Sequence, residues 1–270
     1  MTALEKLQKA IRDHNTLLCV GLDTDLPKIP KFLLKQKDPL FSFNQKIVDA
    51  TSDLVCAYKI NIAFYEALGP SGIESLRKSI KYIPKHILSI LDAKRSDIGN
   101  TAEKYASAIF DYFGADATTL NPYLGLDSLL PFVERPDKLS FVLCLTSNKS
   151  ARDFQFLKVK NKALYLEVAR KVKSWNKNKN LGLVVGATHP RQLAEVRRVA
   201  GDLPFLIPGV GAQGGDLEKA VQLGAGRREM AVINSSREII YASKDKDFAS
   251  QARLKASEMY QKINLARRKR

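Results

Sequence analysis

Short apolar runs alternate with longer amphipathic segments along the whole chain. The runs are continuously apolar rather than alternating with polar residues, which is typical of strands buried on both faces of a parallel sheet. Eight segments have this character and are predicted to be strands: 17–21, 54–59, 87–91, 117–120, 141–146, 181–186, 205–208 and 230–234.

The segments between these strands repeat their apolar residues at helical spacing. The predicted helices are 1–11, 41–51, 73–81, 100–113, 128–133, 162–175, 191–200, 215–223 and 247–266. This alternation favours a (β/α)8 barrel, the TIM-barrel fold of the α/β class, in one domain that spans residues 1–270. A doubly wound open sheet is the structural alternative. The stretch 23–40 is predicted to be an elaborated first loop rather than a domain boundary.

The composition is ordinary for a soluble globular protein, with 270 residues of which 45% are hydrophobic and 27% charged. Neither a membrane-spanning apolar run nor a secretory signal is apparent, so we expect a cytoplasmic protein with no membrane partner. Three scattered cysteines, Cys19, Cys56 and Cys144, suit buried apolar positions better than a disulfide framework or a zinc site. The three histidines share no metal-ligand spacing.

The formal net charge of +16 is compatible with anionic substrates or with a nucleic-acid partner. Basic residues are spread along the chain, with local clusters at 173–179 and 267–270. Aromatic residues do not interleave with these clusters, as a stacking platform for bases requires. We therefore expect a solvated basic surface and no nucleic-acid partner.

Polar residues follow every predicted strand, where the catalytic groups of such barrels lie. They are Asp23, Lys59, Asn61, Asp92, Lys94, Asp97, Asn121, Ser147, Asn148, Thr188, His189, Gln213, Ser235, Ser236 and Arg237, and the seventh strand is also followed by the glycines Gly209, Gly211, Gly214 and Gly215. The carboxyl ends of the strands in a barrel face one side, so we expect one shared pocket.

The most specific of these patterns is Asp92-x-Lys94-x-x-Asp97. Strand alternation directs Asp92 and Lys94 to the same side, and Asp97 is expected at the N-cap or first turn of the next helix. Two carboxylates around an ammonium keep the lysine charged, which suits a proton donor and not an amine that attacks a carbonyl. A structural salt-bridge cluster at the barrel rim explains the same pattern.

Two other charged residues allow two interpretations each. Lys59 closes an apolar strand, and its side chain either extends out of the core to solvent or belongs to the site. Asp23 either caps a turn or binds a hydroxyl group.

Two loops near the C-terminus predict a phosphate site. The segment 208–216 is rich in glycine and precedes a helix, where free backbone N–H groups bind anions. Arg237, after the eighth strand, adds a guanidinium group. Phosphate at the seventh and eighth loops is a recurring barrel arrangement. The glycine spacing matches no nucleotide-cofactor fingerprint.

The segment 91–101, Leu-Asp-Ala-Lys-Arg-Ser-Asp-Ile-Gly-Asn-Thr, resembles the signature of orotidine 5′-phosphate decarboxylases. The likeness extends in order to the segments 20–23, 59–66, 185–188, 208–216 and 233–239. The segment 121–125 resembles the bacterial and mycobacterial-type subgroup of that family.

The resemblance implies a metal-free and cofactor-free homodimer that converts orotidine 5′-monophosphate to uridine 5′-monophosphate and CO2 in de novo pyrimidine synthesis. It implies that Lys94 delivers a proton to C6 within a charge network of Asp92, Asp97 and Lys59. The other roles that it implies are these: Asp97, Ile98 and Thr101 in the partner's active site, Asp23 and Lys59 at the ribose, Ser147 at the pyrimidine, and Gln213 and Arg237 at the phosphate.

Two departures from the family pattern and three rival functions remain. Ile60 stands where relatives often have proline, and 224–230 looks unlike the usual segment before the last strand.

A barrel enzyme acting on a sugar phosphate, such as a hexulose-phosphate synthase, shares the Asp-x-Lys-x-x-Asp pattern but needs magnesium. A Schiff-base aldolase that uses Lys59 or Lys94 and an RNA-binding module are the other two.

Overall fold

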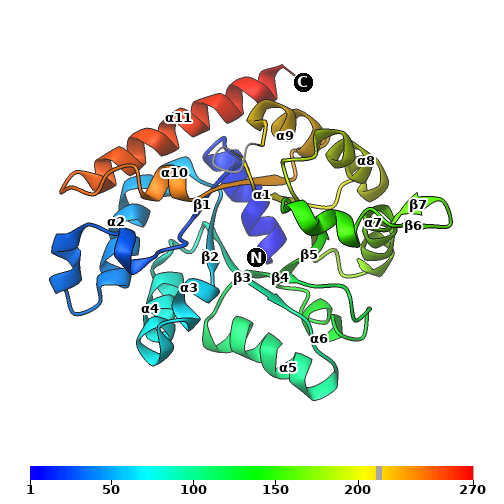
Figure 1. Ribbon diagram of the computed structural model, residues 1–270, viewed down its shortest axis with the longest axis horizontal. Helices are drawn as coiled ribbons and strands as arrows, with labels where there is room; N and C mark the ends of the chain where they lie inside the picture. Colours follow the sequence, from blue (N-terminus) through cyan, green and yellow to red (C-terminus); the bar gives the residue numbers. More distant parts are fainter. Residues whose placement is uncertain (211–214, 270) are drawn as a thin grey trace.

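Eight parallel strands close into a barrel in the computed structural model, which describes residues 1–210 and 215–269 (Figure 1). The strand order around the barrel is β1-β10-β9-β8-β5-β4-β3-β2. The bounds are β1 Leu18–Gly21, β2 Ala57–Asn61, β3 Leu88–Arg95, β4 Ala117–Leu120, β5 Leu139–Leu145, β8 Leu181–Val185, β9 Phe205–Ile207 and β10 Ala231–Ser235. The predicted (β/α)8 barrel is confirmed, and the open-sheet alternative is wrong.

The barrel closes where the first strand pairs with the last. Leu18 lies opposite Ile233 in the β1–β10 ladder, and Cys19 lies opposite Ala57 in the β1–β2 ladder. Every residue of β1, β4, β8, β9 and β10 is buried, which explains why these strands are mainly apolar in sequence.

Helices surround the strands on the outside of the barrel (Figure 1). The longer helices are α1 Ala3–Asp13, α2 Pro39–Thr51, α4 Gly69–Tyr82, α5 Gly99–Ser107, α7 Leu164–Trp175, α8 Pro190–Ala200, α9 Leu217–Gly224 and α11 Phe248–Arg268. Three short helices are α3 Ala63–Glu66, α6 Leu130–Val133 and α10 Arg237–Ile240. Four-residue helices give no periodic signal, which is why α3 and α10 were not predicted.

Helix α1 covers the amino-terminal ends of the strands. Its Lys6 Nζ lies 2.6 Å from Asp116 Oδ1, just before β4, and the Ala3 N–H donates to the Asp137 carbonyl, just before β5. The opposite end of the barrel is left open for the pocket.

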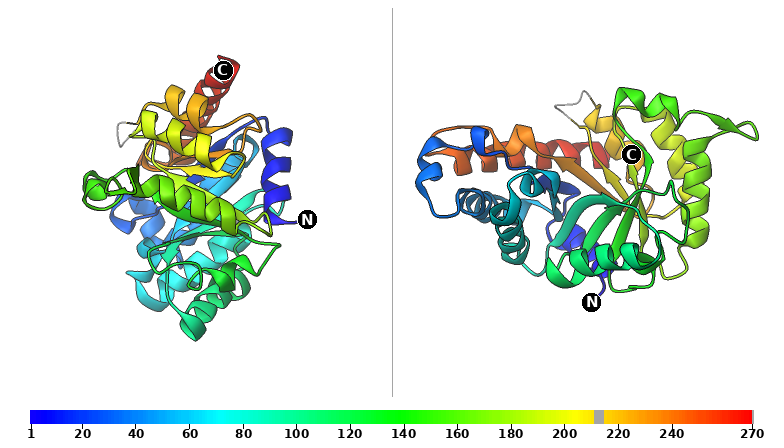
Figure 2. Two further views of the ribbon diagram at one scale, coloured as in Figure 1. Left: turned by 90° about the vertical axis from the view of Figure 1, so that its right-hand side faces the viewer. Right: turned by 60° about the horizontal axis from the view of Figure 1, so that its bottom comes forward.

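Two predicted helices differ in detail. The helix predicted over 162–175 begins only at Leu164, because Lys162–Ala163 forms β7, which pairs antiparallel with β6, Lys158–Val159. This hairpin projects from the barrel (Figure 2). The helix predicted over 100–113 is split into α5 and a π-helical turn, Ala108–Tyr112.

The segment 224–230 enters β10 through a network centred on Arg197. The Arg197 guanidinium donates to the carbonyls of Gly224 (3.0 Å) and Met230 (3.3 Å), and it lies 3.4 Å from the ring centre of Phe205. Gly226 has a φ of +64°, which glycine adopts without strain. The unusual sequence therefore leaves β10 regular.

Ile60 leaves β2 regular as well. It is fully buried and lies opposite Leu91 in the β2–β3 ladder.

The three cysteines are buried and free, as predicted. No helix in the described part of the chain is both long enough and apolar enough to cross a membrane.

Candidate active site

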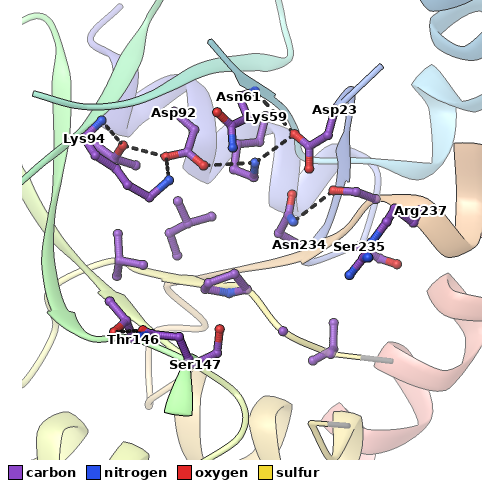
Figure 3. A pocket seen from close by; sticks show the side chains of 18 of the residues that line it. Asp23, Lys59, Asn61, Asp92, Lys94, Thr146, Ser147, Asn234, Ser235 and Arg237 are labelled. Atoms are coloured by element: carbon purple, nitrogen blue, oxygen red, sulfur yellow. Dashed lines mark hydrogen bonds and ion pairs between the residues drawn. The ribbon is translucent and has the colours of Figure 1, made fainter. Parts of the chain in front are cut away.

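A pocket of about 420 Å³ opens at the carboxyl ends of the strands (Figure 3). Its lining includes many of the predicted strand-end residues: Asp23, Lys59, Asn61, Asp92, Lys94, Ser147, Asn148, Gly209, Ser235, Ser236 and Arg237. Asn121, Thr188 and His189 do not line it. The prediction that polar strand ends share one pocket is therefore confirmed for most of them.

Four side chains of alternating charge form one wall of this pocket (Figure 3). The buried Lys59, in the middle of β2, bridges two carboxylates, with Nζ 3.3 Å from Asp23 Oδ1 and 3.2 Å from Asp92 Oδ2. Asp92 Oδ1 in turn lies 2.7 Å from Lys94 Nζ. The order along the wall is thus Asp23, Lys59, Asp92, Lys94.

The network fixes the charge of its buried members. Burial by itself disfavours the charged Lys59, but the carboxylates of Asp23 and Asp92 outweigh it and raise the pKa of Lys59 above its usual value. Burial likewise opposes ionisation of Asp92, yet Lys59, Lys94 and the Thr119 hydroxyl hold the pKa of Asp92 well below its usual range. Both groups are charged at neutral pH.

Lys94 does not follow simple strand alternation. Its φ is +47°, a left-handed conformation that is uncommon for a residue other than glycine. The β3–β4 register shifts at this point, because Leu91 pairs with Thr118 and Arg95 pairs with Leu120. Lys94 and Asp92 meet because the chain bulges here, whereas the sequence had suggested a regular strand.

Thr119 is a pocket residue that the sequence reasoning missed. Its side chain lines the pocket, donates to Asp92 Oδ1 (2.7 Å) and accepts the Lys94 N–H (2.9 Å). A threonine inside an apolar strand is a signal, since a buried hydroxyl needs a partner. Thr118 gives the same signal but donates to the Leu91 carbonyl (2.8 Å) and does not line the pocket. The sequence offers no means of choosing between the two.

Asp97, Ile98 and Thr101 lie outside this pocket. Asp97 was predicted at the N-cap or in the first turn of α5, but it precedes both, because Ile98 is the N-cap; Asp97 Oδ1 accepts the Ile98 N–H (2.8 Å). Within the described chain, Asp97 forms no ion pair with Lys94, which has only Asp92 as its carboxylate partner. The expected pair of carboxylates around Lys94 is thus not formed inside one subunit.

The side of the pocket opposite the charged wall carries Thr146 and Ser147 at the end of β5 (Figure 3). Apolar side chains complete the lining: Leu143, Val184, Leu206 and Val210. Gly186, directly after β8, lets the chain pass close to Ser147 after β5, because a Cβ at residue 186 would lie 2.9 Å from the Ser147 nitrogen. The pocket therefore has a charged wall on one side and a partly apolar wall on the other.

The β9 and β10 loops form the remaining end of the pocket. Arg237 stands at the first position of α10, and its guanidinium forms no hydrogen bond or ion pair with any residue that the structure describes. Gly209 has a φ of +92° and its carbonyl accepts the Gly215 N–H (3.1 Å). Gln213 lies outside the described residues. Among the residues that the structure describes, no three or more His, Cys, Asp or Glu side chains lie close enough together to hold a metal ion.

Known proteins resemble this chain along almost its whole length. The model of the orotidine 5′-phosphate decarboxylase / HUMPS family matches residues 16–252. Orotidine 5′-phosphate decarboxylase of Herpetosiphon aurantiacus is 50% identical over 252 residues, 93% of each chain. The enzyme of that name from Dehalococcoides mccartyi is 48% identical with both chains fully covered. The structure of Leishmania donovani OMP decarboxylase has a TM-score of 0.88 at 38% identity and 99% coverage of both chains. The chain belongs to the orotidine 5′-phosphate decarboxylase / HUMPS family.

Proposed function

We propose that this protein decarboxylates orotidine 5′-monophosphate to uridine 5′-monophosphate and CO2, a reaction of de novo pyrimidine synthesis. The observation that carries the proposal is the row of alternating charges on one pocket wall, which ends at the Lys94 ammonium. Full-length relatives at 47–50% identity are named for this activity.

The chemistry requires a stabilised carbanion. Loss of CO2 leaves a lone pair on C6 in the plane of the pyrimidine ring, where no adjacent group delocalises it. The half-exposed ammonium of Lys94 opposes this charge and then donates a proton to C6. Asp92 holds the ammonium in place through its 2.7 Å ion pair.

Repulsion of the substrate carboxylate by Asp92 contributes only part of the rate. Like charges at about 4 Å and an effective dielectric near 20 interact by roughly 4 kcal/mol. A demanding enzymatic reaction needs a barrier lower by roughly 8–23 kcal/mol. Fixed charges around C6 and binding energy from the distant phosphate supply the remainder.

The other substrate groups are assigned to the residues that the family resemblance implies. Asp23 and Lys59 bind ribose hydroxyls, Ser147 contacts the pyrimidine, and Arg237 with Gln213 binds the phosphate. The Arg237 guanidinium supports this assignment because it has no partner among the described residues, so an anion meets a free bidentate donor.

The proposed enzyme is a homodimer in which Asp97, Ile98 and Thr101 complete the partner's site. Three large apolar side chains beyond β3 and β4 are exposed in the monomer, with Ile98 at 60%, Tyr123 at 84% and Leu124 at 47%. Exposed apolar residues near a site that lacks its second carboxylate favour burial against another copy.

The direct test follows the loss of ultraviolet absorbance of orotidine 5′-monophosphate in the presence of EDTA. Turnover in EDTA supports orotidine 5′-monophosphate as the substrate and shows that the reaction does not need a metal ion. Turnover of a hexulose phosphate with magnesium, without turnover of the nucleotide, supports the sugar-phosphate alternative and contradicts the proposal.

The shared site is tested by mixing two inactive variants, Lys94→Ala and Asp97→Ala. In a mixed dimer one site receives Lys94 from one chain and Asp97 from the other, so activity returns. If Asp97 acts within its own chain, every site keeps one defect and mixing restores nothing. The total concentration is held constant, and each variant alone is the control.

A further inference from the structure

The bulge in β3 leaves a backbone group without a ladder partner. Between the pairs Leu91–Thr118 and Arg95–Leu120, three residues of β3 lie opposite the single residue Thr119. Lys94 is one of these three and has no register partner in β4. Its partly buried N–H donates instead to the Thr119 hydroxyl at 2.9 Å.

The same hydroxyl also holds the side chain to which Lys94 is paired. Its proton points to Asp92 Oδ1 at 2.7 Å, the oxygen that accepts from Lys94 Nζ at 2.7 Å. Thr119 is 1% exposed and its bond to Asp92 is buried, so water does not compete for that bond. One oxygen therefore fixes Lys94 at both ends: directly at the backbone and, through Asp92, at the ammonium.

We infer that Thr119 is a positioning residue that keeps the Lys94 ammonium aimed into the pocket. This inference rests on the proposed function, because it assigns Thr119 a part in the same proton delivery. A φ of +47° at Lys94 is held by the surrounding bonds rather than by intrinsic preference. Without the hydroxyl, Lys94 relaxes toward a common conformation and its ammonium moves away from C6.

The test compares Thr119→Val, which keeps the shape and removes the hydroxyl, with Thr119→Ser, which retains it. A small displacement of a catalytic group can cost about 100-fold in rate, so we expect kcat of Thr119→Val to fall by about that factor while KM changes less than about threefold. Thr119→Ser should keep most of the activity. A uniform loss of folded protein would also lower the apparent kcat at an unchanged KM, so kcat is expressed per folded active site, counted by titration with uridine 5′-monophosphate.

Thr118→Val is the matched control, because Thr118 is the adjacent buried threonine and its hydroxyl donates to the Leu91 carbonyl instead. Both valine variants lose one buried hydrogen bond, so their melting temperatures should fall by similar amounts. Normal kcat in Thr119→Val, or an equal fall in Thr118→Val, overturns the inference. Absence of nucleotide turnover in the unmodified protein contradicts the proposed function instead, so the two failures are distinguishable.

Discussion

The two ends of the pocket differ in how completely their charges are paired. At the β1–β4 end, Asp23, Lys59, Asp92 and Lys94 form a continuous chain of ion pairs. At the β10 end, the Arg237 guanidinium has no partner within the described residues. The first end is organised before the substrate arrives, whereas the second presents free donors. Preorganised charge lowers a barrier, and free donors bind an anion.

The largest effect should come from the paired end, in Lys94→Ala. This change removes both the charge that faces the carbanion and the proton donor, so kcat should fall by about 10⁴-fold or more. Binding of uridine 5′-monophosphate, measured by titration calorimetry, should stay within a few-fold because the phosphate end is untouched. Lys262→Ala, an exposed position on α11, is the control. Near-normal turnover in Lys94→Ala would remove this lysine from the mechanism.

Asp92→Asn should reveal the cost of breaking the buried pairs. Leaving Lys59 without Asp92 should destabilise the fold by about 3 kcal/mol at neutral pH, measured by urea unfolding. Folding lowers the pKa of Asp92, so the stability it provides is present above the ordinary carboxyl value of 3.8 and is lost as the pH falls below it.

The difference between the unmodified protein and Asp92→Asn should therefore be constant near neutral pH and shrink below about pH 4. The raised pKa of Lys59 gives the opposite dependence, with stability present below its ordinary value of 10.5 and lost as the pH rises further. The exposed Asp127→Asn serves as the control. A difference that widens in acid would contradict the assigned pairing.

The smallest of the three effects is expected at the unpaired end, in Arg237→Ala. Hydrogen bonds to charged groups contribute about 1.5–3 kcal/mol, so KM should rise by about 10- to 100-fold with little change in kcat. The nucleoside orotidine, which has no phosphate, should show no difference between the variant and the unmodified protein. An unchanged KM for the nucleotide would exclude Arg237 from the phosphate site.

Much of the fold follows from the apolar pattern, since strands buried on both faces can be recognised without knowledge of their neighbours. The charged wall was also predictable, because Lys59 and Asp92 stand at the ends of the strands predicted from sequence and the strand ends of a barrel converge. Two features were not predictable. The bulge at Lys94 depends on the register between β3 and β4, and the choice of Thr119 over Thr118 depends on that bulge. Both are tertiary properties.

Closure of the barrel between β1 and β10 has a consequence for synthesis of the chain. Leu18 cannot pair with Ile233 until the ribosome has released the last strand. At about 5–20 residues per second, the first strand waits about 10–40 s for its neighbour. Asp23 and Arg237 follow those two strands, so the nucleotide pocket forms only after nearly the whole chain has been made. Contacts this distant in sequence also slow folding, and during the delay the open edge of β1 is exposed to aggregation.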